Sequence, residues 1–169
     1  MIFRLSQKLN AKIKAGPLVD LPMDENPFAD WSAHLFMVGR TQYILVSNTK
    51  SLYSTVILGN GINSTGTFTE RVLGNLREFL ADDGQQFTYR RLIASASSKS
   101  QFAKALNRTI TSSMNELILS ATAWLEDGIS PYEVGFKLNT VLLSAIAPTK
   151  AAKYGLPREA FKAMASGMD

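Results

Sequence analysis

Few side chains of this sequence can act as acids, bases or nucleophiles. The chain has one histidine, His34, and no cysteine, which excludes thiol nucleophiles, disulfides and cysteine-built zinc sites. His34 can serve as a general base only if a serine nucleophile and an orienting carboxylate lie beside it in the fold. The serines considered are Ser32, Ser54 and Ser113. An ordinary strand histidine explains the residue equally well and is preferred, so no catalytic residue is assigned.

Metal and cofactor sites have no clear motif either. Adjacent carboxylates occur at Asp82-Asp83 and at Glu126-Asp127. Both pairs follow predicted helices and precede a glycine, so solvated helix ends explain them, and no metal site is predicted. The Gly59-Asn60-Gly61 segment lacks the lysine of a phosphate-binding loop and is typical of a turn after a strand. No cofactor is predicted.

The charge distribution suggests one possible contact surface. The net charge is +4 and the isoelectric point about 9.4. Residues 84–115 contain five basic residues and no acidic one, whereas the early loop is acidic. These five residues are the candidates for nucleic-acid contact: Arg90, Arg91, Lys99, Lys104 and Arg108. A solvated face that partly pairs with the acidic loop is the preferred interpretation.

A second group of polar residues can line a pocket if the fold gathers them. The segment 107–116 places residues that favour caps and turns inside an otherwise helical pattern. The pocket candidates are His34, Arg40, Asn48, Arg108, Ser113, Asn115, Glu116 and Asn139. Structural hydrogen bonding by the amides is the alternative.

Strand and helix patterns alternate in the first half of the chain. Residues 2–6 alternate apolar and polar side chains as a half-buried strand does, and Ser6 then caps a short helix over 7–15. Three prolines and four acidic residues predict a loop over 17–30. The β-branched and aromatic residues of 31–58 predict three strands in an antiparallel meander.

A helix over 67–81 should follow the meander. Its apolar face comprises Phe68, Val72, Leu76, Phe79 and Leu80. Residues 87–96 are expected to add a fourth strand.

Helices dominate the predicted C-terminal half. Apolar residues recur at helical spacing over 100–127 and predict the longest helix, although the polar segment allows a later start near Ser112. The sequence Ser130-Pro131-Tyr132-Glu133 predicts a helix start by capping, with an end near residue 147. A last helix is predicted over 157–165.

Several spaced residues together resemble a known family. They are Trp31, His34-Leu35-Phe36, Arg40, Asn48-Thr49, Ser54, Arg108, Ser113-Met114-Asn115-Glu116 and Leu138-Asn139. The pattern resembles a bacterial family described only as a domain of unknown function. The resemblance covers nearly the whole chain and implies an α/β fold with an antiparallel sheet and no established activity. Family members carry asparagine where this chain has His34.

These observations predict one globular α+β domain over 1–169. We expect a mostly antiparallel sheet of three to five strands, covered by helices from the C-terminal half. The absence of a signal-peptide pattern and of an apolar stretch of about 20 residues predicts a cytoplasmic protein that does not enter a membrane.

The preferred function is a non-enzymatic binding or regulatory module that acts on another protein. The family resemblance associates it with mobile elements or accessory gene sets. The alternatives are a nucleic-acid-associated protein that uses the basic residues, and a small enzyme with a polar pocket. No oligomeric state is predicted.

Overall fold

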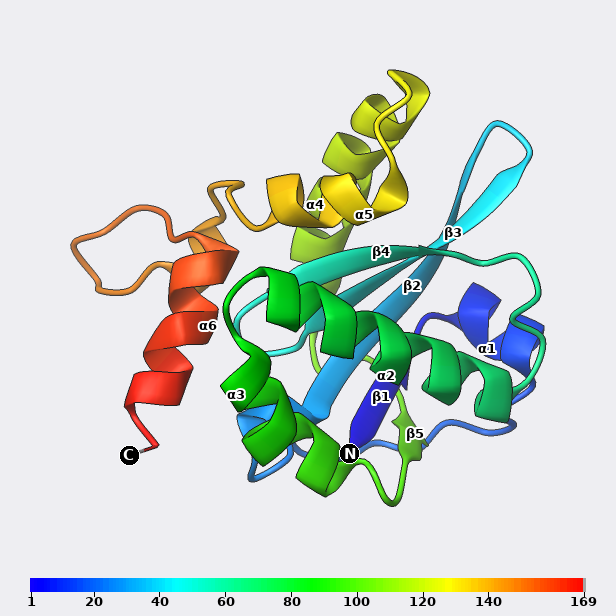
Figure 1. Cartoon of the computed structure of the whole chain (residues 1–169), viewed down its shortest axis with the longest axis horizontal. Coiled ribbons are helices and arrows are strands. Elements are labelled where there is room, and N and C mark those ends of the chain that lie inside the picture. The colour runs from blue at the N-terminus through cyan, green and yellow to red at the C-terminus, as the bar shows by residue number, and fades with distance from the viewer. Residues whose placement is uncertain (169) are drawn as a thin grey trace.

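Five strands pair edge to edge at the centre of the molecule, in the order β4-β3-β2-β1-β5 (Figure 1). The computed structural model describes residues 1–168. The strands are β1 (Ile2–Leu5), β2 (Asp30–Val38), β3 (Thr41–Asn48), β4 (Ser54–Leu58) and β5 (Gln101–Ala103). The pairings β2–β3 and β3–β4 are antiparallel, which confirms the predicted meander. β1 runs parallel to both β2 and β5, so the sheet is mixed.

Helices cover both faces of the sheet. They are α1 (Gln7–Ile13), α2 (Thr65–Asp82), α3 (Gln86–Thr88), α4 (Arg108–Glu126), α5 (Pro131–Leu138) and α6 (Pro157–Ser166). Two hydrophobic clusters mark the two faces. One joins α1, α2 and α6 to Trp31 and Ile44, and the other joins α4 and α5 to Phe36 and Leu45. Helices of the N-terminal half therefore cover one face as well. Within residues 1–168, no helix is long and apolar enough to cross a membrane.

Local capping signals position the helices as the sequence predicts. The Ser6 hydroxyl accepts from the Leu9 N–H at the start of α1. The Ser130 hydroxyl accepts from the Glu133 N–H, as in a capping box, and donates to the Glu133 carboxylate. All five apolar residues predicted for the inner face of α2 are buried.

Three expected elements are wrong, each for a local reason. Residues 87–96 form α3, a π-helix over 89–93 and a 3-10 turn, not a strand, because Tyr89, Leu92, Ile93 and Ala96 pack against the core at helical spacing.

The longest helix begins at Arg108 rather than near residue 100. Asn107 caps it by accepting from the Ile110 N–H. The residues before it form β5, where Phe102 stacks on Phe3 of β1. A three-residue strand is too short to show a periodicity of its own. The apolar residues of β5 therefore fitted the helical spacing of the segment that follows, and the helix was predicted to begin too early.

The helix predicted to reach residue 147 ends at Leu138. There the Asn139 side chain bonds to the backbone of β4 instead of continuing the helical surface. A 3-10 turn over 144–146 follows.

A buried ion pair joins β1 to β2. Arg4 and Asp30 have 1% and 0% exposed side chains, and the guanidinium donates two bonds of 2.8 Å to the carboxylate. The remaining guanidinium N–H groups donate to the carbonyls of Leu21, Pro22 and Lys104. The pair thus fixes the loop before β2 and the chain that leaves β5.

Removal of the carboxylate charge should destabilise the fold strongly. Asp30→Asn leaves the Arg4 charge buried without a counter-ion, so we expect the free energy of unfolding to fall by about 3–5 kcal/mol. Urea denaturation measures the change. The control is Asp20→Asn, which removes the exposed partner of Lys104 and should stay within about 1 kcal/mol of the wild type. Equal small losses in both variants would contradict the structural role of the buried pair.

Candidate functional site

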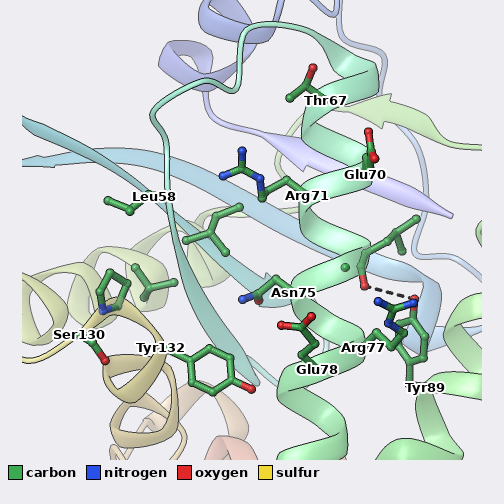
Figure 2. A pocket seen from close by; sticks show the side chains of 15 residues that line it. Leu58, Thr67, Glu70, Arg71, Asn75, Arg77, Glu78, Tyr89, Ser130 and Tyr132 are labelled. Atoms are coloured by element: carbon green, nitrogen blue, oxygen red, sulfur yellow. Dashed lines mark hydrogen bonds between the residues drawn. The ribbon is translucent and has the colours of Figure 1, made fainter.

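A groove of about 950 Å³ lies between α2, β4 and the start of α5 (Figure 2). Its floor includes Val56 and Leu58 of β4. One wall is formed by α2 from Thr67 to Glu78, and the N-terminus of α5 contributes Ser130 and Tyr132 opposite. The volume is within the usual range of ligand pockets.

β4 is exposed in this groove only at its last residue, Leu58. β4 is an edge strand, and alternate residues of an antiparallel strand direct their N–H and C=O groups to opposite sides. The Gly59 N–H donates to Gln42 of β3, whereas the Ser54 N–H and C=O bond to Asn139, away from β3. By this alternation, the N–H and C=O groups of Val56 and Leu58 also point away from β3. Val56 is only 1% exposed, so the fold covers its backbone groups. Leu58 is 45% exposed, and within residues 1–168 its backbone groups have no hydrogen-bond partner.

The first part of the same edge is closed by α5. The Asn139 amide accepts from the Ser54 N–H at 2.7 Å and donates to the Ser54 carbonyl at 3.0 Å, as a neighbouring strand would. Gly135 allows this approach, because a Cβ there would lie 3.3 Å from the Thr55 Cα and 2.8 Å from the Phe79 ring. The open part of the edge is therefore limited to Leu58, because Val56 is buried.

The α2 wall is hollow in the middle and polar on either side. A Cβ added at Gly74 would meet no atom within 4 Å. Asn75 accepts a 2.8 Å hydrogen bond from the Thr55 hydroxyl, which holds α2 against β4. Leu58 is 45% exposed beside the groove. The site thus offers open backbone groups, an apolar side chain and free space next to a helix.

Two tyrosines mark the margins of the groove. The Tyr132 hydroxyl donates to Asp82 at 2.7 Å, and partial burial together with this bond raises the pKa of Tyr132 above its ordinary value. The Tyr89 hydroxyl donates to the Leu73 carbonyl, and burial raises the pKa of Tyr89. Both phenols therefore stay protonated at neutral pH and act as hydrogen-bonding groups.

A family model described as Domain of unknown function (DUF6933) matches residues 2–160. The chain belongs to this family. The resemblance inferred from the spaced motifs is thereby confirmed at the level of the family. Comparisons with curated proteins and with solved structures give no match.

The eight pocket candidates of this DUF6933 chain occupy separate structural roles. Within residues 1–168, their side chains make no hydrogen bond to one another, and none lines the groove. Asn48 donates to the carbonyls of Pro27 and Asp30 and accepts from Ser51, so it organises the β3–β4 turn.

The other members of the set are distributed over three elements. Ser113 donates to the Thr109 carbonyl within α4. Arg40 is exposed at the β2–β3 hairpin, and Arg108, Asn115 and Glu116 are exposed on α4. His34 is half-buried on β2.

The five basic candidates are all exposed. Lys104 forms an exposed 3.4 Å ion pair with Asp20, which confirms the predicted attraction between the basic segment and the acidic loop. Arg91 lies over the Phe87 ring at 5.7 Å.

The groove residues were missed by the sequence analysis. Leu58, Gly74 and Tyr132 come from three distant segments, and their proximity follows from the tertiary fold. The one local signal is Gly74, a glycine inside an otherwise regular helical pattern.

Burial of His34 makes the stability depend on pH. Burial lowers the pKa of His34 from its ordinary value of 6.5, so the unfolded chain binds this proton more readily than the folded chain. The stabilisation is therefore complete above about pH 6.5 and declines as the pH falls below that value. We expect His34→Asn to remove the part of the loss of stability at low pH that comes from protonation of His34. Urea denaturation of both proteins between pH 7.5 and 5.5 tests this, and identical slopes would contradict it.

Proposed function

We propose that the protein is a non-enzymatic binding module that acts on another protein. It takes up an extended segment of its partner as an additional strand beside β4. The observation that carries the proposal is the edge residue Leu58, which is 45% exposed in the groove and directs its N–H and C=O groups away from β3. Open sheet edges bind extended peptides through backbone hydrogen bonds, and neighbouring side chains supply the specificity.

The recessed edge favours a single extended chain over a second copy of the protein. The walls formed by α2 and by the start of α5 rise beside Leu58 of β4 (Figure 2). Two such edges would bring their walls into collision before the strands met. A partner segment without walls of its own fits this shape.

The lining favours binding over catalysis. It supplies hydroxyl groups from Thr67 and Ser130, and among the residues that line it there is no histidine to activate them. A module that holds a segment of its partner in extended form would regulate that partner without chemistry. Such a role fits the accessory or mobile-element function expected from the family resemblance.

Backbone methylation provides a direct test of strand addition. A phage-displayed library of random dodecapeptides is selected on the full chain, and the enriched peptides are synthesised with single N-methyl amides. In an added strand only alternate N–H groups face β4. We expect methylation at alternate positions to weaken binding by about tenfold, since it removes a hydrogen bond and adds a clash. Fluorescence polarisation measures the affinities.

The amide NMR signal of Leu58 should shift when the unmodified peptides bind. Uniform tolerance of methylation, or a library that yields no binder, would contradict the proposal. So would a dimer through β4 in light scattering.

Substitution of Gly74 should separate stability from binding. Gly74→Ala removes the penalty of a glycine inside a helix and should raise the free energy of unfolding by about 1 kcal/mol. Its methyl group would project into the groove and should weaken binding of the selected peptides. Gly66→Ala is the control, because Gly66 belongs to the same helix but does not line the groove. Unchanged binding by Gly74→Ala would show that no ligand occupies this wall.

The nucleic-acid function is the second candidate, and the exposure of all five basic residues supports it. Anisotropy of labelled DNA and RNA at two salt concentrations distinguishes the two functions. Tight binding that weakens steeply with salt, and that is lost in Arg90→Ala/Arg91→Ala, would favour the nucleic-acid function.

A further inference from the structure

Phe87 of α3 is an aromatic residue that the hydrophobic core does not use. It is 66% exposed, the highest value among the phenylalanine, tyrosine and tryptophan residues of 1–168. Phenylalanine is usually buried, because contact between its ring and water is unfavourable. The Arg91 guanidinium lies over the ring, 5.7 Å from its centroid. Since the ring stays largely exposed beside this guanidinium, Phe87 retains apolar surface for a ligand.

Phe87 borders a pocket of about 300 Å³ between α3, the π-helix over 89–93 and the C-terminal end of α6 (Figure 1). Leu92, Ala165 and Met168 supply further apolar surface. Among the residues of 1–168 that line this pocket, Arg91 is the only charged one. The volume is at the lower end of the range for ligand pockets and suits a flat ring better than a large ligand.

The π-helix presents two arginines beside this pocket. Tyr89, Leu92 and Ile93 pack against the core, whereas Arg90 and Arg91 are both exposed. Within residues 1–168, neither arginine makes an ion pair. Both guanidinium groups are therefore available to an anionic partner.

The acidic residues of the neighbouring segments do not line the pocket. Asp82 and Asp83, at the end of α2, accept hydrogen bonds from tyrosine hydroxyls. Asp24 lies 4.0 Å from the N-terminal amine, and Glu25 lines a neighbouring pocket. Residues 84–115 themselves contain no acidic residue. The surface around Phe87 thus favours a negatively charged ligand.

A flat apolar recess with guanidinium groups at its margin matches the chemistry of a nucleotide. A base can stack on the Phe87 ring, while the phosphates on either side pair with Arg90 and Arg91. The bases of a duplex already stack on one another, so an unpaired strand supplies the free base.

A membrane surface fits this site less well than a nucleic acid does. Helices that lie on membranes bury an apolar face of several residues. In α3 and the π-helix, Phe87 is the one large apolar residue that is exposed.

We propose that the protein binds single-stranded nucleic acid, with one base stacked on Phe87 in this pocket and the flanking phosphates on Arg90 and Arg91. The proposal rests on the nucleic-acid function considered above and specifies its site and the unpaired state of the strand. It is independent of strand addition, because this pocket shares no lining residue with the groove beside β4.

Two probes with the same number of phosphates separate stacking from charge attraction. One is a fluorescein-labelled oligothymidylate of about twelve nucleotides. The other carries the same label on a strand in which every nucleoside is replaced by an abasic tetrahydrofuran unit. The wild-type protein should bind the oligothymidylate about tenfold more tightly, because the abasic strand has no base to stack. Fluorescence polarisation at about 50 and 200 mM salt measures both affinities.

Substitution of Phe87 tests the site itself. Phe87→Leu keeps an apolar side chain but removes the ring, and it should bind both probes equally. Phe87→Tyr should retain the wild-type preference. The matched control is Tyr154→Leu, which removes another exposed ring with a cation over it, that of Lys153, outside the pocket. Arg90→Ala should weaken the binding of both probes and reduce the salt dependence by about one phosphate contact.

The possible failures of the two ideas are distinguishable. Equal, salt-sensitive binding of both probes by the wild type would overturn base stacking and leave the nucleic-acid function standing. A preference that persists in Phe87→Leu would place the stacked base elsewhere and overturn this site. If neither probe binds, the nucleic-acid function fails and the inference fails with it. Binding to phosphatidylglycerol vesicles that is lost in Phe87→Leu, without binding of either strand, would assign the surface to a membrane instead.

Discussion

The Arg4 guanidinium has five N–H donors, and each has an acceptor inside the protein. Two bonds go to Asp30, and the others go to carbonyls of the loop before β2 and of Lys104. Transfer of two charges out of water is unfavourable unless the remaining hydrogen bonds are all made. The pair is therefore satisfied only when three separate segments occupy their native positions. This requirement connects β1, the irregular loop and the chain after β5.

That arrangement determines which edge of the sheet stays open. The loop held by Arg4 carries Val19 alongside Ala103, and the Lys104 N–H donates to the Val19 carbonyl. The β5 edge is therefore partly covered. At the opposite edge, the Asn139 side chain bonds to the N–H and C=O groups of Ser54, as a neighbouring strand would. The two edges differ because one is covered by backbone, whereas the other is covered by α5 up to Val56 and is exposed at Leu58.

Local signals account for the parts of the fold that the sequence predicted. Ser6 and Ser130 fix helix starts by hydrogen bonds to residues three positions away, and the α2 stripe is a one-helix pattern. β5 was missed because its pairing with β1 is a contact over about one hundred residues, which a pattern of three residues does not encode. Asn48 and Asn139 were grouped as pocket candidates because their chemistry suits both ligands and backbone, and the structure shows them bonded to backbone. The groove was missed for the same reason as β5, since its residues meet only in the folded chain.

Two features of the groove are unfavourable for the stability of the isolated protein. Open N–H and C=O groups at an edge expose the protein to unwanted pairing, and natural sheets usually cover them. Gly74 lowers the helix propensity of α2 at a position where an alanine would fit. Sequences tend to follow local rules except where function opposes them. The two departures converge on one groove, as the proposed binding of an extended segment beside Leu58 and Gly74 requires.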